Sequence, residues 1–140
     1  MEFSRGERVE ISIKQKDFYG SYYTGKFLSG VGLNKFLVEY ETLRSNRCET
    51  SRITDIVDAP NVRPFPPEVK VTDFSLHDIV DAYENDAWWV GTISGIINST
   101  NYYVYFENTG EIFAYPNSDL RVHQELVNGN WVVSHKKGLK

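Results

Sequence analysis

Apolar and polar positions alternate along this chain in short runs, and clusters of Gly, Asn, Asp and Ser separate the runs. The runs are rich in β-branched and aromatic residues, as in Leu37–Thr42 and Tyr103–Asn108. A period of two residues indicates β-strands, because successive side chains of a strand point to opposite faces. No stretch sustains the 3.6-residue period of a helix, so the pattern predicts an all-β fold of antiparallel strands.

The same series of segments occurs twice, with the aromatic pairs and the glycines in corresponding places. The separation between matched residues shrinks along the chain, which indicates that the strands persist while the loops differ in length. The repeat therefore predicts two copies of one small unit. The four matches are Arg8–Ile11 with Ile79–Ala82, Tyr22–Phe27 with Trp88–Ile93, Leu37–Thr42 with Tyr103–Asn108, and Ser51–Ile56 with Tyr115–Leu120.

A proline-rich segment, Ala59–Pro67, lies between the two copies. Proline has no backbone N–H and cannot sit in a central strand or a helix interior, so we expect a stiff extended connector there. The predicted domains are residues 1–67, which end in the connector, and residues 68–140. Units of this size with five short strands are expected to close into small barrels rather than expose long sheet edges.

Charge is distributed unevenly between the halves. Residues 76–123 contain one base, Arg121, against seven acids, whereas residues 1–75 are balanced. A negative field favours a basic partner. The net charge of -4 argues against nucleic acid as the direct ligand, because binding to a phosphate backbone depends on Lys and Arg.

Signatures of catalysis and of metal binding are absent from the sequence. The histidines His77, His123 and His135 lack metal-ligand spacing, and the single cysteine, Cys48, can supply neither a disulfide nor a zinc cluster. No glycine-rich phosphate loop occurs, and no run approaches the roughly 20 apolar residues of a membrane span. We therefore expect a binding module in a reducing compartment, without cofactor or metal, and not an enzyme.

The repeated segments resemble plant Agenet domains, members of the Tudor-like group (Royal superfamily) of chromatin readers. This resemblance implies two tandem Tudor-like barrels in a nuclear protein that binds a histone H3 tail methylated on lysine, as plant heterochromatin readers bind dimethylated lysine nine. Because linked weak sites gain affinity, we also expect further repeats in a longer protein. The resemblance extends from about Ser4 to about Trp131 and rests on Gly6–Glu10, Gly20–Gly25, Leu37–Tyr40, Val62–Pro67, Asp86–Gly91 and Tyr103–Phe106.

A methylated lysine keeps its charge but loses hydrogen-bond donors, so aromatic rings recognise its polarised methyl groups. The resemblance places such a cage in the second module at Tyr83, Trp89, Phe106 and Asn108. Adjacent strand residues face opposite sides, so only one tryptophan shares the side of Gly91; we choose Trp89, with Trp88 as the alternative. Nearby acids are expected to attract the basic tail: Asp81, Glu84, Asp86, Glu107 and Glu111.

The first module departs from this pattern because it lacks an aromatic residue at the end of its first strand. Its secondary cage candidates are Tyr23 and Tyr40, and Phe18 or Tyr19 could replace the missing ring. The equivalent positions are Ser12, Tyr23, Tyr40 and Thr42.

Two other functions remain open. Any one aromatic residue, considered alone, more often fills a small barrel's core than binds a ligand. Trp131 is expected to start a final strand or to pack on the barrel. A methylation-independent protein–protein scaffold would bind methylated and unmethylated peptides equally. Binding of single-stranded RNA by aromatic stacking is the weaker alternative, because the acidic balance opposes it.

Overall fold

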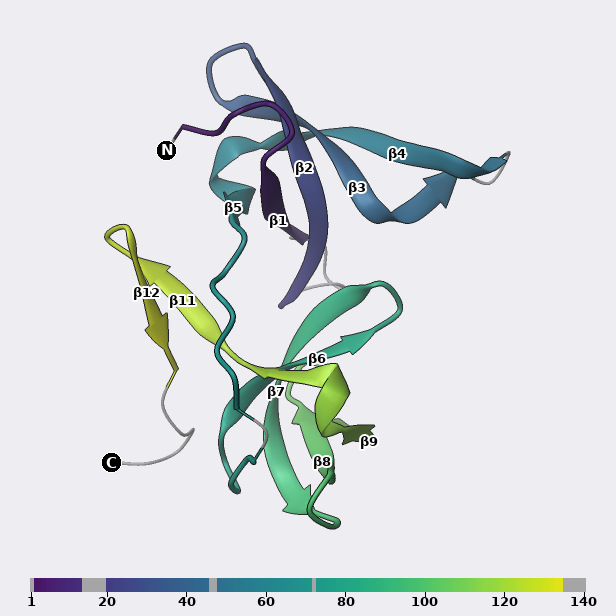
Figure 1. Ribbon diagram of the computed structural model, residues 1–140, viewed down its shortest axis with the longest axis vertical. Coiled ribbons are helices and arrows are strands. Elements are labelled where there is room, and N and C mark those ends of the chain that lie inside the picture. Colours follow the sequence, from purple (N-terminus) through teal and green to yellow (C-terminus); the bar gives the residue numbers. More distant parts are fainter. Residues whose placement is uncertain (1, 14–19, 46–47, 72, 135–140) are drawn as a thin grey trace. The chain divides into compact units, whose positions relative to one another are not determined.

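The computed structural model describes residues 2–13, 20–45, 48–71 and 73–134, and the chain divides into two compact units, Met1–Phe65 and Pro66–Lys140 (Figure 1). The described residues form β-strands, turns and single turns of 3-10 helix, so the all-β prediction is confirmed. Within these residues there is no helix with the length and apolar character needed to cross a membrane.

The first unit is a five-stranded antiparallel sheet. Its strands follow the order β5-β1-β2-β3-β4, because β1 pairs with both β2 and β5, and β3 pairs with both β2 and β4. One face carries the core, which consists of Val9, Ile11, Phe27, Val38, Tyr40 and Val62. The elements are β1 (Arg8–Ile13), β2 (Ser21–Val31), β3 (Lys35–Ser45), β4 (Cys48–Asp58), the 3-10 turn η2 (Ala59–Asn61) and β5 (Val62–Pro64).

The second unit repeats this topology, with the strand order β10-β6-β7-β8-β9. Its core consists of Phe74, Val80, Ala82, Ile93, Tyr102, Val104, Tyr115 and Leu120. The strands and 3-10 turn are β6 (Ile79–Glu84), β7 (Ala87–Ile96), β8 (Asn101–Phe106), β9 (Glu111–Pro116), η3 (Asn117–Asp119) and β10 (Leu120–Val122).

An additional hairpin follows the second sheet. It consists of β11 (Gln124–Val127) and β12 (Asn130–Val133), which pair only with each other among the described strands. The two turn residues, Asn128 and Gly129, both have positive φ, as a type I′ hairpin turn requires. Trp131 lies in β12, so its prediction as part of a final strand is confirmed, whereas the hairpin itself was not expected.

Two details of the sequence prediction are wrong. The expected extended connector is mostly part of the first unit, because Ala59–Asn61 forms the 3-10 turn η2 and Val62–Pro64 forms strand β5, which pairs with β1. Its proline is tolerated because β5 is a short strand at the end of the sheet order. The fourth repeat match is also displaced: η2 and η3 occupy the same place in the two units, so β9 corresponds to residues 53–58 of β4.

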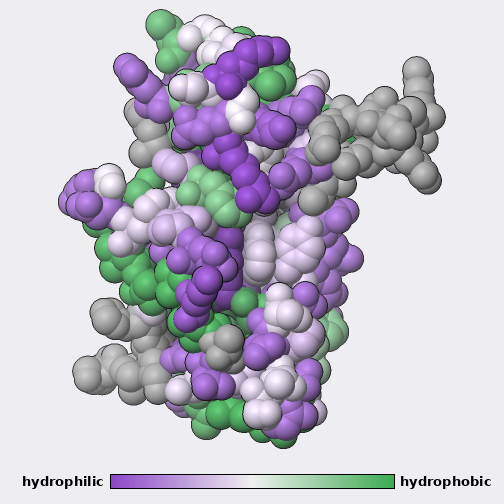
Figure 2. Space-filling model, viewed as in Figure 1, coloured by the Kyte–Doolittle hydropathy of each residue, from purple (hydrophilic) through white to green (hydrophobic). Residues whose placement is uncertain are grey.

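Apolar side chains reach the surface as well as the core. Green apolar patches lie among hydrophilic residues on the face shown in Figure 2. In the second unit, Tyr103 on β8 and Ile112 on β9 are 46% and 54% exposed, and they belong to the sheet face opposite the core. Alternation therefore leaves apolar residues on both faces of the β8–β9 pair.

Candidate functional site

Strand β7 directs its two adjacent tryptophans to opposite faces of the sheet. Gly91 and Ile93 are buried on the core face, and alternation places Trp89 on that face with them. Trp88 lies on the other face, opposite Tyr83 of β6 in the register. The predicted cage residues therefore belong to two separate clusters.

The cluster on the outer face is occupied by a cation of the chain itself. The rings of Tyr83 and Trp88 meet with centroids 5.1 Å apart. The guanidinium carbon of Arg121 lies 4.2 Å from the centroid of Trp88, and its Nε donates a hydrogen bond of 2.8 Å to Asp81. The electron-rich face of Trp88 already interacts with a positive charge.

The cluster on the core face lies where that core reaches the end of the barrel. A side chain at Gly91 would place its Cβ 2.5 Å from Cγ1 of Val104 and 3.1 Å from Cε1 of Phe106, so the glycine allows both side chains to lie against β7. Trp89 comes two residues before Gly91 on the same face, and its indole N–H donates to the backbone oxygen of Glu84 at 2.7 Å. Trp89 and Phe106 are both partly exposed.

Strand β9 adds two aromatic residues that the sequence prediction missed. The Phe106 ring centroid lies 6.3 Å from that of Phe113 and 6.1 Å from that of Tyr115. The Tyr115 hydroxyl donates a 2.5 Å hydrogen bond to Oε1 of Glu84, which connects β9 to the end of β6. We call Glu84, Trp89, Phe106, Phe113 and Tyr115 the candidate cage.

The candidate cage is open to solvent at one side. Phe113 is 44% exposed and Glu84 is exposed, whereas Tyr115 is buried with 7% exposure. Burial, and then the hydrogen bond to Glu84, raise the pKa of the Tyr115 phenol well above its usual range, so the hydroxyl remains a donor. Three partly or largely exposed rings beside a carboxylate suit an alkylated ammonium ion.

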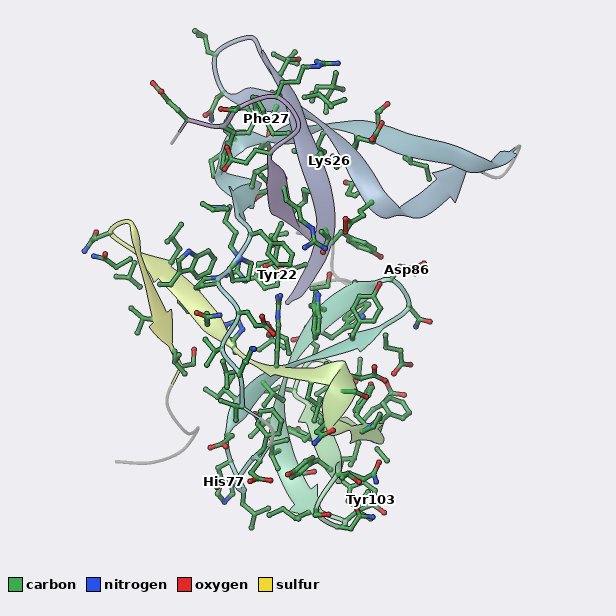
Figure 3. The ribbon with its side chains drawn as sticks, in the orientation of Figure 1. Tyr22, Lys26, Phe27, His77, Asp86 and Tyr103 are labelled. Atoms are coloured by element: carbon green, nitrogen blue, oxygen red, sulfur yellow. The ribbon has the colours of Figure 1, made fainter. Side chains whose placement is uncertain are left out.

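Further acidic residues lie at the same end of the second barrel. The β6–β7 turn and the β8–β9 loop are at one end of the sheet, because the four strands form an antiparallel meander. Asp86 lies in the first of these (Figure 3), with the positive φ that this two-residue turn requires. Glu107, Asn108 and Glu111 are exposed in or beside the second. This end of the barrel is therefore negatively charged.

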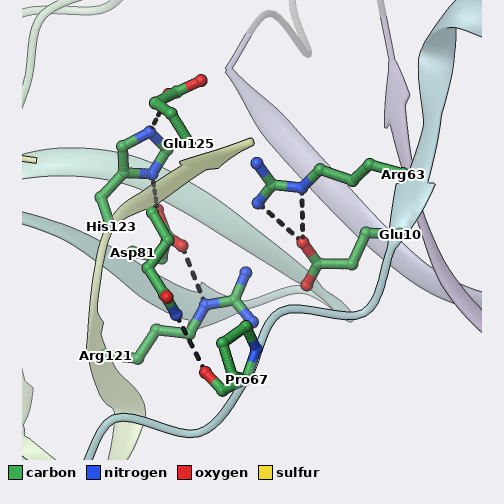
Figure 4. Close-up of polar contacts among 8 residues, drawn as sticks. Glu10, Arg63, Pro67, Asp81, Arg121, His123 and Glu125 are labelled. Carbon is green, nitrogen blue, oxygen red and sulfur yellow. Dashed lines mark hydrogen bonds and ion pairs between the residues drawn. The ribbon is translucent and has the colours of Figure 1, made fainter. Parts of the chain in front are cut away.

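Asp81, another predicted contact for the peptide, belongs to an internal network instead of the barrel end (Figure 4). Its carboxylate is 1% exposed, and its oxygens contact Arg121 Nε at 2.8 Å and His123 Nδ1 at 2.7 Å. The other ring nitrogen of His123 contacts Glu125 on β11. The next side chain, Gln124, donates to the backbone oxygen of Pro67 at 2.9 Å. This network joins the additional hairpin to the sheet.

The first unit has a more closed counterpart of the candidate cage. The rings of Tyr23 and Tyr40 meet edge to face with centroids 5.9 Å apart, but Tyr40 is only 4% exposed. Its hydroxyl donates to Asp55 at 3.1 Å, and burial followed by the Asp55 charge raises the pKa of Tyr40. Asp55 pairs with Val38 as Phe113 pairs with Val104, so a carboxylate replaces a ring.

Some sequence predictions fall outside what can be described. Phe18 and Tyr19 lie outside the described residues, and the surroundings of the Thr42 side chain are likewise not described. Within the described parts of the chain, no group of three or more His, Cys, Asp or Glu residues could hold a metal ion.

Known proteins resemble this chain over most of its length. The Agenet domain family model matches residues 6–67. The chain is 37% identical over 135 residues to Protein AGENET DOMAIN (AGD)-CONTAINING P1 of Arabidopsis thaliana, covering 96% of this chain and 26% of that protein. It is 28% identical over 138 residues to DUF724 domain-containing protein 3 of the same plant, covering 94% of this chain and 20% of the relative. The chain thus spans about a quarter or less of these curated relatives.

Solved structures agree with both units. The crystal structure of Arabidopsis thaliana AGDP1 AGD34 superposes with a TM-score of 0.87 and 32% identity, covering 94% of this chain and 90% of that one. The tandem Agenet domain 3-4 of ADCP1 gives a TM-score of 0.83, also at 32% identity, over 95% of this chain and 89% of that one. The match confirms the predicted pair of small five-stranded Tudor-like barrels. The chain therefore belongs to the plant Agenet-domain family and contains two Agenet barrels in tandem.

Proposed function

We propose that this chain is a nuclear chromatin reader that binds a lysine-methylated histone H3 tail through the candidate cage of its second unit. Dimethylated lysine nine is the modification that the family resemblance implies. The observation that carries the proposal is the group of rings from Trp89, Phe106 and Phe113 beside the carboxylate of Glu84.

The chemistry of the site supports this ligand. A methylated ammonium ion is attracted by the faces of aromatic rings, most strongly where water is partly excluded. A nearby carboxylate adds a charge interaction without requiring the donors that methylation removes. The cage residues come from β7, β8, β9 and the end of β6, so the barrel holds them on strands instead of on mobile loops.

The surrounding charge supports a basic peptide as the rest of the ligand. Asp86, Glu107 and Glu111 lie at the cage end of the barrel. Complementary charge steers such a partner and increases its rate of association. A histone tail has the required density of Lys and Arg around a modified lysine.

Comparison of the two units supports the second as the methyl-lysine site. In the first unit, Tyr40 is buried and its hydroxyl is bonded to Asp55, whereas the equivalent Phe106 is partly exposed. An aromatic face must be accessible to contact a ligand. The first unit is therefore assigned a supporting role.

Substitution of the cage rings tests the proposal. Trp89→Ala and Phe106→Ala should each weaken binding of a dimethyl-lysine H3 peptide by about tenfold or more in calorimetric titration, as for a buried aromatic hot spot. Leu33→Ala is the control, because Leu33 is fully exposed in the first unit. Unchanged affinity in both cage variants, with their folds intact, would show that the cage assignment is wrong.

A methylation-independent scaffold is the second candidate. Exposed apolar side chains on the outer face of β8 and β9, including Tyr103 and Ile112, favour it, since such surface often marks a protein interface. A scaffold of this kind would bind methylated and unmethylated peptides with equal affinity. It would also lose binding on Ile112→Asp rather than on Trp89→Ala.

A further inference from the structure

The carboxylate of the candidate cage is held in place by a buried tyrosine. Tyr115 is 7% exposed, and its ring packs edge to face against Phe106 at a centroid distance of 6.1 Å. Its hydroxyl donates to Oε1 of Glu84 at 2.5 Å. Packing in the core therefore fixes the Tyr115 hydroxyl. Its hydrogen bond in turn fixes the exposed carboxylate of Glu84, which would otherwise sample several rotamers.

Glu84 also has a fixed backbone position beside the rings. It is the last residue of β6, directly opposite Ala87, and its backbone oxygen accepts the indole N–H of Trp89 at 2.7 Å. Its side chain therefore starts next to Trp89 and ends at Tyr115. Contacts within the second unit therefore hold both ends of Glu84, its backbone at Trp89 and its carboxylate at Tyr115.

A carboxylate has acceptor capacity beyond a single bond, so Glu84 can accept a second donor while it is bonded to Tyr115. Monomethyl and dimethyl ammonium ions retain an N–H group, whereas a trimethyl ammonium ion has none. A charge-assisted hydrogen bond from such an N–H is stronger than the contact of a quaternary ion with the same oxygen.

We infer that Tyr115 is a positioning residue that orients Glu84 to accept the N–H of a mono- or dimethylated lysine, and so sets the methylation state that the site prefers. This inference rests on the proposed function. It assigns no direct ligand contact to the Tyr115 hydroxyl, which acts through the carboxylate.

The test compares dimethyl-lysine and trimethyl-lysine H3 peptides in calorimetric titrations of the whole chain. The unsubstituted protein should prefer the dimethyl peptide by about tenfold, the effect of one charge-assisted hydrogen bond. Tyr115→Phe keeps the ring and removes the hydroxyl, so it should reduce the preference to about twofold or less. Its trimethyl affinity should change by less than about threefold, because the rings remain.

Tyr102→Phe is the matched control. Tyr102 is also a buried core tyrosine of the second unit, and its hydroxyl accepts a hydrogen bond from the Phe74 backbone N–H at 3.2 Å. Its loss should leave the ratio of the two affinities unchanged. Glu84→Gln gives a second test at an exposed position that tolerates substitution, and it should also reduce the ratio.

The outcomes separate the two claims. A preference of unchanged size in Tyr115→Phe and in Glu84→Gln would overturn the positioning role while leaving the reader function intact. Equal affinity of the unsubstituted chain for the dimethyl and trimethyl peptides would also overturn the positioning role and leave the reader function intact. Failure of the unsubstituted chain to distinguish methylated from unmethylated peptide would overturn the reader function and this inference together.

Discussion

The guanidinium of Arg121 lies over the indole of Trp88, with 4.2 Å between the guanidinium carbon and the ring centroid. The first unit has the same arrangement, in which Arg63 lies 3.9 Å from the ring centroid of Tyr22. Both aromatic residues are on the outer face of the second strand of their barrel. Each repeat thus uses its own arginine to cover an aromatic ring, which distinguishes Trp88 from the neighbouring Trp89.

Trp88 and Trp89 should therefore respond differently to substitution. Trp88→Ala removes a cation–π contact of about 0.5–2 kcal/mol as well as packing against Tyr83, so it should lower the free energy of unfolding. It should change the peptide affinity of the folded protein by less than about twofold, against about tenfold for Trp89→Ala. Urea denaturation and calorimetric titration measure the two effects. A Trp88→Ala protein of normal stability that fails to bind would contradict this division.

Each covering arginine is also paired with a carboxylate. Glu10 accepts from Arg63 at 2.8 Å and is 0% exposed, and Asp81 accepts from Arg121 at the same distance (Figure 4). Both pairs sit at corresponding registers, since β5 pairs with β1 as β10 pairs with β6. Buried pairs of this kind are sensitive to removal of one partner, because the remaining charge stays out of water.

Burial should determine how much each ion pair contributes to the free energy of unfolding. Asp81→Asn should destabilise the second unit by about 3–5 kcal/mol, the usual cost of breaking a buried pair. Asp58→Asn removes the negative charge from an ion pair with Lys35 that is shorter, 2.6 Å, but both side chains are more than half exposed. It should cost at most about 1 kcal/mol. Equal shifts of the urea midpoint in the two variants would refute this ranking.

The His123 contacts predict a dependence of stability on pH. Burial by itself would lower the pKa of this imidazole, but the hydrogen bond and charge of Asp81, followed by those of Glu125, raise it above 6.5. A folded-state pKa above the unfolded one means that the stabilisation is fully present below pH 6.5 and is lost as pH rises through the folded value.

Thermal denaturation across this range measures the effect. The melting temperature should fall as pH rises above about 6.5, and His123→Gln should flatten this part of the profile. His77→Asn is the control, because His77 is exposed and its positive φ is tolerated by Asn. A profile that keeps its slope in His123→Gln but loses it in His77→Asn would contradict this prediction, because it would show that His77 causes the pH dependence.

The repeat was the part of the fold that the sequence predicted well. The aromatic pairs at Tyr22 and Trp88 occupy the same register position, opposite Ser12 and Tyr83 respectively, so the match made from residue types corresponds to a structural equivalence. Strand alternation likewise placed Trp89 with Gly91. These features depend on local pattern, which a single sequence displays.

The two aromatic residues that β9 contributes to the candidate cage could not be predicted from the same pattern. Phe113 and Tyr115 come near Phe106 only because β8 and β9 pair with Phe106 opposite Glu111. The turn at residues 107–110 sets that register, and Gly110 with its positive φ was the available signal. The match of residues 51–56 with residues 115–120 hid the equivalence of β9 with β4, because it followed polar residues of the 3-10 turn η3 instead of the strand.

The internal network was missed for a different reason. Asp81 appeared to be one of several surface acids in an acidic half, but Arg121 and His123 come from about 40 residues further along and bury it. Sequence position alone does not reveal which acidic residue of this half pairs with Arg121, the single base of residues 76–123. The partner became visible only through the pairing of β10 with β6.

The most direct test of the reader function is calorimetric titration of this chain with H3 tail peptides that carry zero, one, two or three methyl groups on lysine nine, with lysine four both free and methylated. The proposed cage predicts micromolar binding that requires methylation at lysine nine. Heats that are equal for all four methylation states would contradict it and would favour the methylation-independent scaffold.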